Sequence, residues 1–283
     1  MSCQTLREHD VAYRGLFTHP ELVEDLLRHF VKEQWVDEID FSTLRRASEI
    51  SVVRCRSLKV RDVVWSVRFR GRALYILILI EFQSRLDPVM ALRQIEYVAG
   101  FYKDLYLQKR LTADGKLPLV LPILLYNGER PWRAPCSVEE MIEEVPELLA
   151  RYQPRMGYFL LDERRAEFEI DQDQRNTVAA VLALEQSRVG DEVFDVVLFL
   201  VNSLREPKHE SLRQAFKEHI LKVLSPDFAP IGRSLRPSRG SDYHPRTPED
   251  LVRRAASRFL RRRCPKGPAD SSGEAVEAQV WQA

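Results

Sequence analysis

The sequence has little that would mark a disulfide framework, a zinc site or a membrane span. Its four cysteines lie far apart, at positions 3, 55, 136 and 264, with no Cys-x-x-Cys pair. This spacing indicates neither disulfides nor zinc and fits a reducing cytoplasm. The N-terminus lacks the apolar stretch of a secretion signal, and the strongest apolar run, residues 74–80, is far shorter than the ~20 residues of a membrane-spanning helix. We therefore predict a cytoplasmic protein with no membrane partner.

The sequence also lacks an excess of either charge. Lys and Arg number 43 and Asp and Glu number 42, for a net charge of +1. Bulk charge therefore does not announce a nucleic-acid partner, and a DNA-binding surface would need local segregation of basic residues. The 283 residues suffice for a domain with its own core and a second, smaller part.

Periodicity predicts a mixed α/β domain in the first half of the chain. Apolar residues at helical spacing predict a helix over 20–30, and strict alternation over 61–69 predicts a strand. A buried strand over 73–83, a long helix over 89–108 and a buried strand over 119–126 follow. This order of helix, antiparallel pair, helix and strand is typical of an α/β fold.

The second half is predicted to be mostly helical. Apolar spacing near 3.6 residues indicates helices over 141–152, 178–185, 192–204 and 211–224. From residue 225 onward Pro, Ser, Arg and Gly dominate, which is typical of a poorly ordered tail. We accordingly expect a core over 1–135, a helical extension over 136–224 and a tail over 225–283.

The two predicted strands at 61–69 and 73–83 can be paired through a tight turn. With Gly71-Arg72 as a two-residue hairpin loop, Trp65 opposes Ile78 and Asp62 opposes Glu81. This register also gathers the apolar residues of both strands on one face.

Two directly opposed carboxylates repel one another unless a cation lies between them. Mg²⁺ prefers a site of one or two carboxylates completed by water and phosphate, and Gln83 lies on the same strand face as Glu81, where it could orient a water. The ordinary alternative is a solvated Asp62 and a Glu81 that merely ends a strand. Glu81 follows an apolar run and precedes Phe82, so a partner for its carboxylate is expected.

At these residues the sequence resembles the recombination-promoting nuclease and putative transposase family of bacteria, within the PD-(D/E)XK superfamily. The resemblance covers roughly residues 9–132 well and weakens toward residue 224. It is carried by the segments HDVAYRGLFTHPELVEDLL, RDVVWSVRF, YILILIEFQSRLDPVMALRQIEYV and LPLVLPILLYNGERPW.

The resemblance implies a restriction-endonuclease-like core, with a mixed central sheet flanked by helices and a helical region after it. It also implies Mg²⁺-dependent cleavage of DNA associated with recombination, with Mn²⁺ as another usable cation. Asp62 and Glu81 would be the metal ligands, and Gln83 would take the place of the superfamily's lysine. Glutamine can position a water but can neither supply positive charge nor take a proton.

Three further residues are weaker candidates. Glu24 lies where many superfamily members supply another metal ligand, but Glu21 and Asp25 beside it favour an ordinary solvated helix face. Arg93 and Tyr97, one helical turn apart, could meet a phosphate or could pair structurally. A homodimer is compatible with cutting both DNA strands.

A different class of function stays open. Gln83 and a tail unlike that of many relatives are also compatible with a catalytically inactive DNA-binding or interaction module derived from a mobile element, since fold alone does not establish activity.

Overall fold

The protein is described here from a computed structural model. The described residues are 11, 13–46, 63–81, 86–144, 146–168, 176–186, 196–197, 199–200 and 202–223. They fall into two compact units, one comprising Leu26–Ala166 and the other Met1–Asp25 with Glu167–Ala283. The predicted tail over 225–283 lies outside the described residues.

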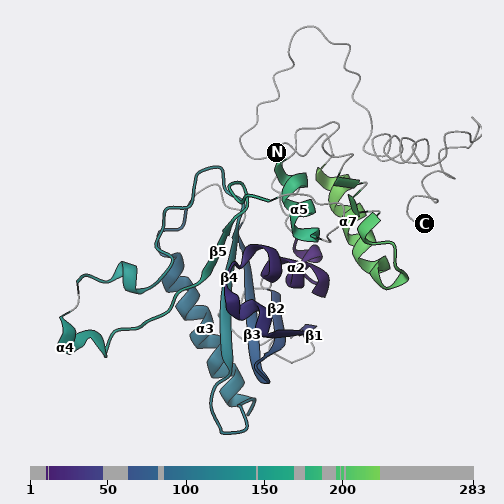
Figure 1. Ribbon diagram of the computed structural model, residues 1–283. Helices are drawn as coiled ribbons and strands as arrows, with labels where there is room; N and C mark the ends of the chain where they lie inside the picture. The colour runs from purple at the N-terminus through teal and green to yellow at the C-terminus, as the bar shows by residue number, and fades with distance from the viewer. Residues whose placement is uncertain are drawn as a thin grey trace, which may run out of the picture. The chain divides into compact units, whose positions relative to one another are not determined.

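The first of these units is built on a five-stranded mixed sheet (Figure 1). Its strands lie in the order in which they occur in the chain: β1 (Ile39–Arg46), β2 (Val63–Phe69), β3 (Arg72–Glu81), β4 (Leu119–Tyr126) and β5 (Phe159–Asp162). The pairs β1–β2 and β2–β3 are antiparallel, whereas β3–β4 and β4–β5 are parallel. The expectation of an α/β fold with a mixed sheet flanked by helices is confirmed.

Helix α3 (Met90–Leu107) crosses between the parallel strands β3 and β4 and covers one face of the sheet (Figure 1). Its buried side chains recur every three or four residues, as a helix with one face on a core requires. Tyr75 of β3 meets Phe101 of α3 with ring centroids 5.2 Å apart. Gln94 is the exception on this face: it is fully buried, and neither polar atom of its amide has a hydrogen-bond partner among the described residues. Such burial costs about 1–3 kcal/mol.

The helix α2 (Pro20–Phe30) and the strands β2, β3 and β4 agree with the sequence predictions to within about two residues over the described positions. β1 and β5 were not predicted. β1 carries an irregularity between Asp40 and Arg45 that breaks its alternation, and β5 has only four residues. Neither pattern is long or regular enough to be read from sequence alone.

The helix expected over 141–152 is wrong. That region holds the 3-10 helix η3 (Glu139–Met141) and one turn of helix, α4 (Glu147–Ala150), in a long excursion between β4 and β5 (Figure 1). Leu148, Leu149 and Tyr152 are exposed there. Met141 and Ile142, at the start of the segment, pack against the core. The exposed apolar residues that follow face no core, so a longer helix would gain nothing from burying them. A further 3-10 helix, η1 (Gln34–Glu38), precedes β1.

In the other unit, α5 (Thr177–Gln186) and α7 (Glu210–Val223) confirm two of the predicted C-terminal helices. The described residues between 196 and 203 are helical as well, and η4 (Pro207–His209) leads into α7. α5 is apolar nearly all round and almost wholly buried, as expected of a helix at the centre of a core.

Candidate active site

Of the predicted catalytic residues, Glu81 lies at the carboxyl end of β3. Glu81 is the last residue of that strand and is described through its backbone pairing. Asp62 and Gln83 lie outside the described residues. The roles assigned to these three residues therefore stay predictions.

The predicted register of β2 and β3 is wrong by two residues. Trp65 pairs with Ile76 rather than with Ile78, and the two-residue turn is Arg70-Gly71, not Gly71-Arg72. Both turn residues have positive φ, 48° and 73°, as in the type I′ turn that suits a hairpin's twist. The inference that Asp62 directly opposes Glu81 loses its basis in this pairing. A shift of two residues leaves every side chain on its original face, so the hydrophobic pattern could not reveal the error.

The three parallel strands end level with one another at this edge of the sheet, and their aligned last residues are called the rank below. Glu81 of β3 pairs with Tyr126 of β4, and Tyr126 pairs with Asp162 of β5. In open α/β sheets, ligands bind beyond the carboxyl ends of the strands. The rank of Glu81, Tyr126 and Asp162 therefore marks the edge where a site is expected.

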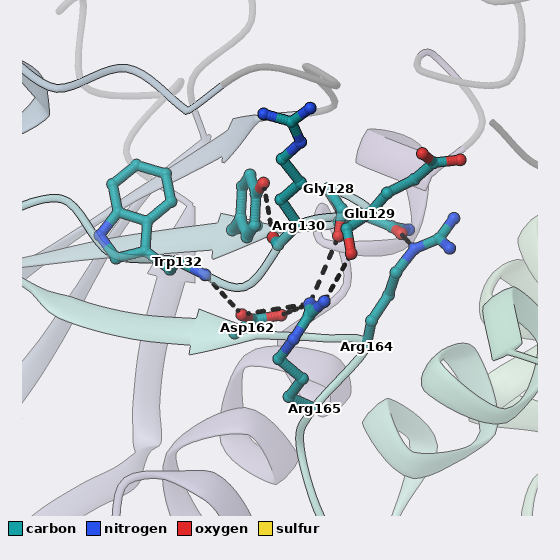
Figure 2. A network of polar contacts seen from close by, with 9 residues as sticks. Gly128, Glu129, Arg130, Trp132, Asp162, Arg164 and Arg165 are labelled. Atoms are coloured by element: carbon teal, nitrogen blue, oxygen red, sulfur yellow. Dashed lines mark hydrogen bonds and ion pairs between the residues drawn. The ribbon is translucent and has the colours of Figure 1, made fainter. Parts of the chain in front are cut away.

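A network of polar contacts holds the turn after β4 against the end of β5 (Figure 2). The hydroxyl of Tyr126 donates to the carbonyl of Arg130 at 2.9 Å, and the Tyr126 ring meets the Trp132 ring at 4.8 Å between centroids. The Asp162 carboxylate accepts from the Trp132 backbone N–H at 3.0 Å. The backbone N–H of Glu163 donates to the Tyr126 carbonyl at 2.9 Å, which extends the link between the strands.

Two consecutive arginines complete this network (Figure 2). Arg165 forms an ion pair with Asp162 at 3.0 Å and donates to the backbone carbonyls of Gly128 and Glu129. Arg164 donates its Nε–H to the Asn127 side-chain oxygen at 3.1 Å. The Tyr-Asn-Gly sequence at 126–128, one of the segments on which the family resemblance rests, is therefore the turn that these arginines bind.

Burial raises the pKa of the Tyr126 hydroxyl, and the neighbouring Asp162 carboxylate acts in the same direction. The guanidinium groups of Arg165, Arg164 and Arg130 oppose this shift. With a raised pKa, Tyr126 is a neutral hydrogen-bond donor at neutral pH. Its role at this edge is therefore that of a fixed donor to the turn.

Arg93 and Tyr97 are brought together on α3. The Arg93 guanidinium donates to the Asp87 carboxylate at 2.6 Å and to the Tyr97 hydroxyl at 3.1 Å. The Arg93 and Asp87 side chains are about one fifth exposed, and Tyr97 is buried. These contacts are those of structural pairing; a phosphate contact by Arg93 stays a prediction.

The acidic face of α2 is not the solvated face that the sequence suggested. Asp25 is buried, and its carboxylate accepts from the backbone N–H and the hydroxyl of Thr177, at 2.8 and 2.6 Å. Asp25 therefore satisfies donors at the start of α5. Glu24, half-buried on the same helix, belongs to a different compact unit from Glu81, and its role as a metal ligand stays a prediction.

Within the described part of the chain, no three or more His, Cys, Asp or Glu side chains gather closely enough to hold a metal ion. Asp162 stands in the rank of Glu81, but its carboxylate already accepts from Trp132 and Arg165. A second carboxylate beside Glu81 would therefore have to come from elsewhere in the chain. No helix among the described residues has the length and apolar character to cross a membrane.

Comparison with known proteins places the chain in a family. The model of the family described as "Putative transposase, YhgA-like" matches residues 7–214, well over half of the sequence. The chain belongs to this family. Membership in the YhgA-like family confirms the resemblance that the motifs suggested.

Curated relatives of the chain come from Escherichia coli. Recombination-promoting nuclease RpnD is 29% identical over 144 residues, 49% of this chain and 53% of its own length. Recombination-promoting nuclease RpnC is 31% identical over 131 residues, 46% of this chain and 42% of its own. The inactive recombination-promoting nuclease-like protein RpnE is 28% identical over 159 residues, which are 56% of this chain and 51% of its own length. The chain spans about half the length of these relatives, and no solved structure matches it.

Sequence reasoning missed Asp162, Arg164 and Arg165 as parts of this edge. These residues lie in a short segment with no periodic signal, and the two arginines are 37 positions beyond the turn residues that they bind. The available signal was the Tyr-Asn-Gly turn itself, which implied a fixed backbone shape at 126–128 and hence partners that hold it.

Proposed function

We propose that the chain is a metal-dependent DNA endonuclease whose catalytic residues are Asp62, Glu81 and Gln83. The observation that carries the proposal is the position of Glu81 at the carboxyl end of β3, in rank with the ends of two further parallel strands. Membership in the YhgA-like family and two relatives named as nucleases support it. A restriction-endonuclease-like core is part of the same proposal.

The donor set suits a hard divalent cation. Glu81 and Asp62 would supply carboxylate oxygens, which Mg²⁺ prefers and Mn²⁺ also accepts. Asp162, the other acid of the rank, is already bound by Arg165, so the proposal keeps Asp62 as the second ligand. When bound, the cation supplies the positive charge that the scissile phosphate and its attacking water require.

Among the chain's own groups, Gln83 would hold the water by hydrogen bonds. An amide cannot remove a proton from that water, so the chemistry depends more on the cation than in relatives with a lysine. We expect cleavage to fall to background when the cation is removed.

The test is nicking and linearisation of plasmid DNA by the purified full chain, with Mg²⁺, Mn²⁺ or EDTA. The variants are Asp62→Asn and Glu81→Gln, which change charge but hardly change volume. Asp114→Asn is the matched control, because Asp114 is an exposed acid in the loop that precedes β4, at the opposite end of the strands. We expect metal-dependent cutting by the parent and the control, and none by either active-site variant.

A second candidate is an inactive DNA-binding or interaction module. One relative of comparable identity is itself named inactive, and Gln83 stands where the superfamily has a lysine. If the folded parent does not cut DNA with any cation, and if Asp62→Asn binds DNA as the parent does, the inactive module becomes the preferred function in place of the nuclease.

A further inference from the structure

Two arginine side chains at the carboxyl edge keep N–H groups that the network at the turn does not use. Arg130 is exposed, and its guanidinium has no hydrogen-bond partner among the described residues. Arg164 is half-buried and uses its Nε–H on Asn127, which leaves both Nη groups without a partner in the described part of the chain. These two residues are called the arginine pair below.

The arginine pair is held on a rigid base. Arg165, the neighbour of Arg164, bonds the Asp162 carboxylate and two carbonyls of the turn that carries Arg130. The Arg130 carbonyl in turn accepts from the buried Tyr126 hydroxyl. The backbone on both sides of the pair is therefore fixed before any ligand binds, which reduces the entropy lost on binding.

The spacing along the edge fits a nucleic-acid backbone. Neighbouring strands lie about 4.8 Å apart, so the end of β5 is roughly 10 Å from the end of β3. Consecutive phosphates of one DNA strand lie about 6–7 Å apart, farther than the axial rise of about 3.4 Å, so this span corresponds to one or two phosphate steps. A duplex with one phosphate at Glu81 would therefore bring phosphates of neighbouring nucleotides to the arginine pair.

An exposed acid of the turn opposes the positive charge of the arginine pair. Glu129 is exposed in the same turn, and its side chain extends on the same side as Arg164 (Figure 2). Asp162 is already paired with Arg165, and Glu163 is buried. Glu129 thus reduces the positive charge of the arginine pair, and Glu81 at the end of β3 is a further acid of this edge.

We propose that Arg130 and Arg164 bind backbone phosphates of duplex DNA that flank the scissile position. The inference rests on the proposed function for the identity of the ligand. A guanidinium is suited to this task because its planar N–H groups match phosphate oxygens in pairs. Such contacts position the duplex without reading its sequence.

The test is binding of a fluorescent 20-base-pair duplex by the full chain in EDTA, where no cutting occurs, over a series of salt concentrations. The double variant Arg130→Gln/Arg164→Gln should bind about tenfold or more weakly, with a salt slope smaller by about two, one for each lost phosphate contact. Glu129→Gln should bind about threefold more tightly. Arg72→Gln is the matched control, since Arg72 is exposed at the amino end of β3, and it should bind as the parent does.

The outcomes separate this inference from the proposed function. If the double variant loses duplex binding and the parent never cuts, the arginine pair remains a DNA contact and the proposed nuclease activity is rejected. A parent that cuts DNA while the folded double variant binds and cuts equally well would overturn the inference alone. The inference would also be overturned if the double variant bound single-stranded RNA more weakly than the parent does but bound duplex DNA equally well.

Discussion

The amino end of β3 and the carboxyl ends of β4 and β5 are held in opposite ways. At the amino end of β3 the chain reverses through Arg70-Gly71, two residues with positive φ, and the Arg70 guanidinium pairs with Glu38 in solvent. At the carboxyl ends of β4 and β5 the buried Tyr126 donates to the turn after β4, and Arg165 bonds both Asp162 and the carbonyls of that turn. Backbone conformation fixes the path of the chain at the first place, and side-chain contacts fix it at the second.

The difference shows in one glycine at each end. A Cβ on Gly71 would meet nothing within 4 Å, but its φ of 73° disfavours any other residue. A Cβ on Gly128 would overlap the hydroxyl and ring of Tyr126, which no real contact allows. Glycine is thus needed for its freedom at one end and for its lack of a side chain at the other.

The largest expected effect is that of Gly128→Ala. Because the added methyl collides with a buried, hydrogen-bonded ring, we expect a loss of about 3 kcal/mol in the free energy of unfolding. Gly71→Ala should cost about 1 kcal/mol, from backbone strain alone. Urea denaturation of both variants gives the comparison.

A double-mutant cycle sharpens this result. In a Tyr126→Leu background the collision at position 128 is relieved, so Gly128→Ala should cost clearly less than in the parent. An equal cost in both backgrounds would mean that the glycine is required for another reason than the ring.

An intermediate effect is expected for Arg165→Gln. This change removes an ion pair and two hydrogen bonds to backbone carbonyls at a partly buried position, so unfolding free energy should fall by about 1–2 kcal/mol. Arg133, shortly after the turn that Arg165 binds, is exposed, and Arg133→Gln should change the unfolding free energy by less than about 0.5 kcal/mol. If Arg165→Gln and Arg133→Gln had equal effects in thermal or urea unfolding, Arg165 would not hold the turn as described.

The smallest effect is expected at the amino end. The hydrogen bond from Arg70 lowers the pKa of the Glu38 carboxyl below its ordinary value of 4.5. A lowered folded-state pKa means that the pair stabilises the fold above the unfolded-state value and ceases to do so as pH falls through the folded-state value. The difference in melting temperature between parent and Glu38→Gln should thus be small at pH 7 and vanish in acid. A difference that grew on acidification would have the wrong sign.

Much of the fold could be predicted from the sequence because long periodic segments bury one face. α2, α3, β3 and β4 are of this kind, and their described bounds agree with the prediction to within about two residues. The segment at 141–152 shares the apolar spacing, but beyond Ile142 its apolar residues Leu148, Leu149 and Tyr152 are exposed, and only Glu147–Ala150 is helical in α4. The local pattern shows that a segment has an apolar face to bury. It does not show whether another surface is present for that face to pack against.

The hairpin register shows a different limit. Sequence reasoning placed the one glycine, Gly71, at the first position of the turn, whereas the protein also places Arg70 in the left-handed region. Contacts from Arg70 to Glu38, both backbone and side chain, offset that local strain. Since both registers keep the same apolar face, only the tertiary contacts could choose between them.

The sequence by itself determined the family, the periodic elements and the presence of Glu81 at the end of a buried strand. These follow from local pattern and motif, which persist wherever the segments are placed. Only the tertiary structure decided that Tyr126 and Asp162 share the rank of Glu81, and that Arg164 and Arg165 bind turn residues 37 positions earlier in the chain. Such contacts arise from the pairing of distant strands, and no spacing within one segment encodes them.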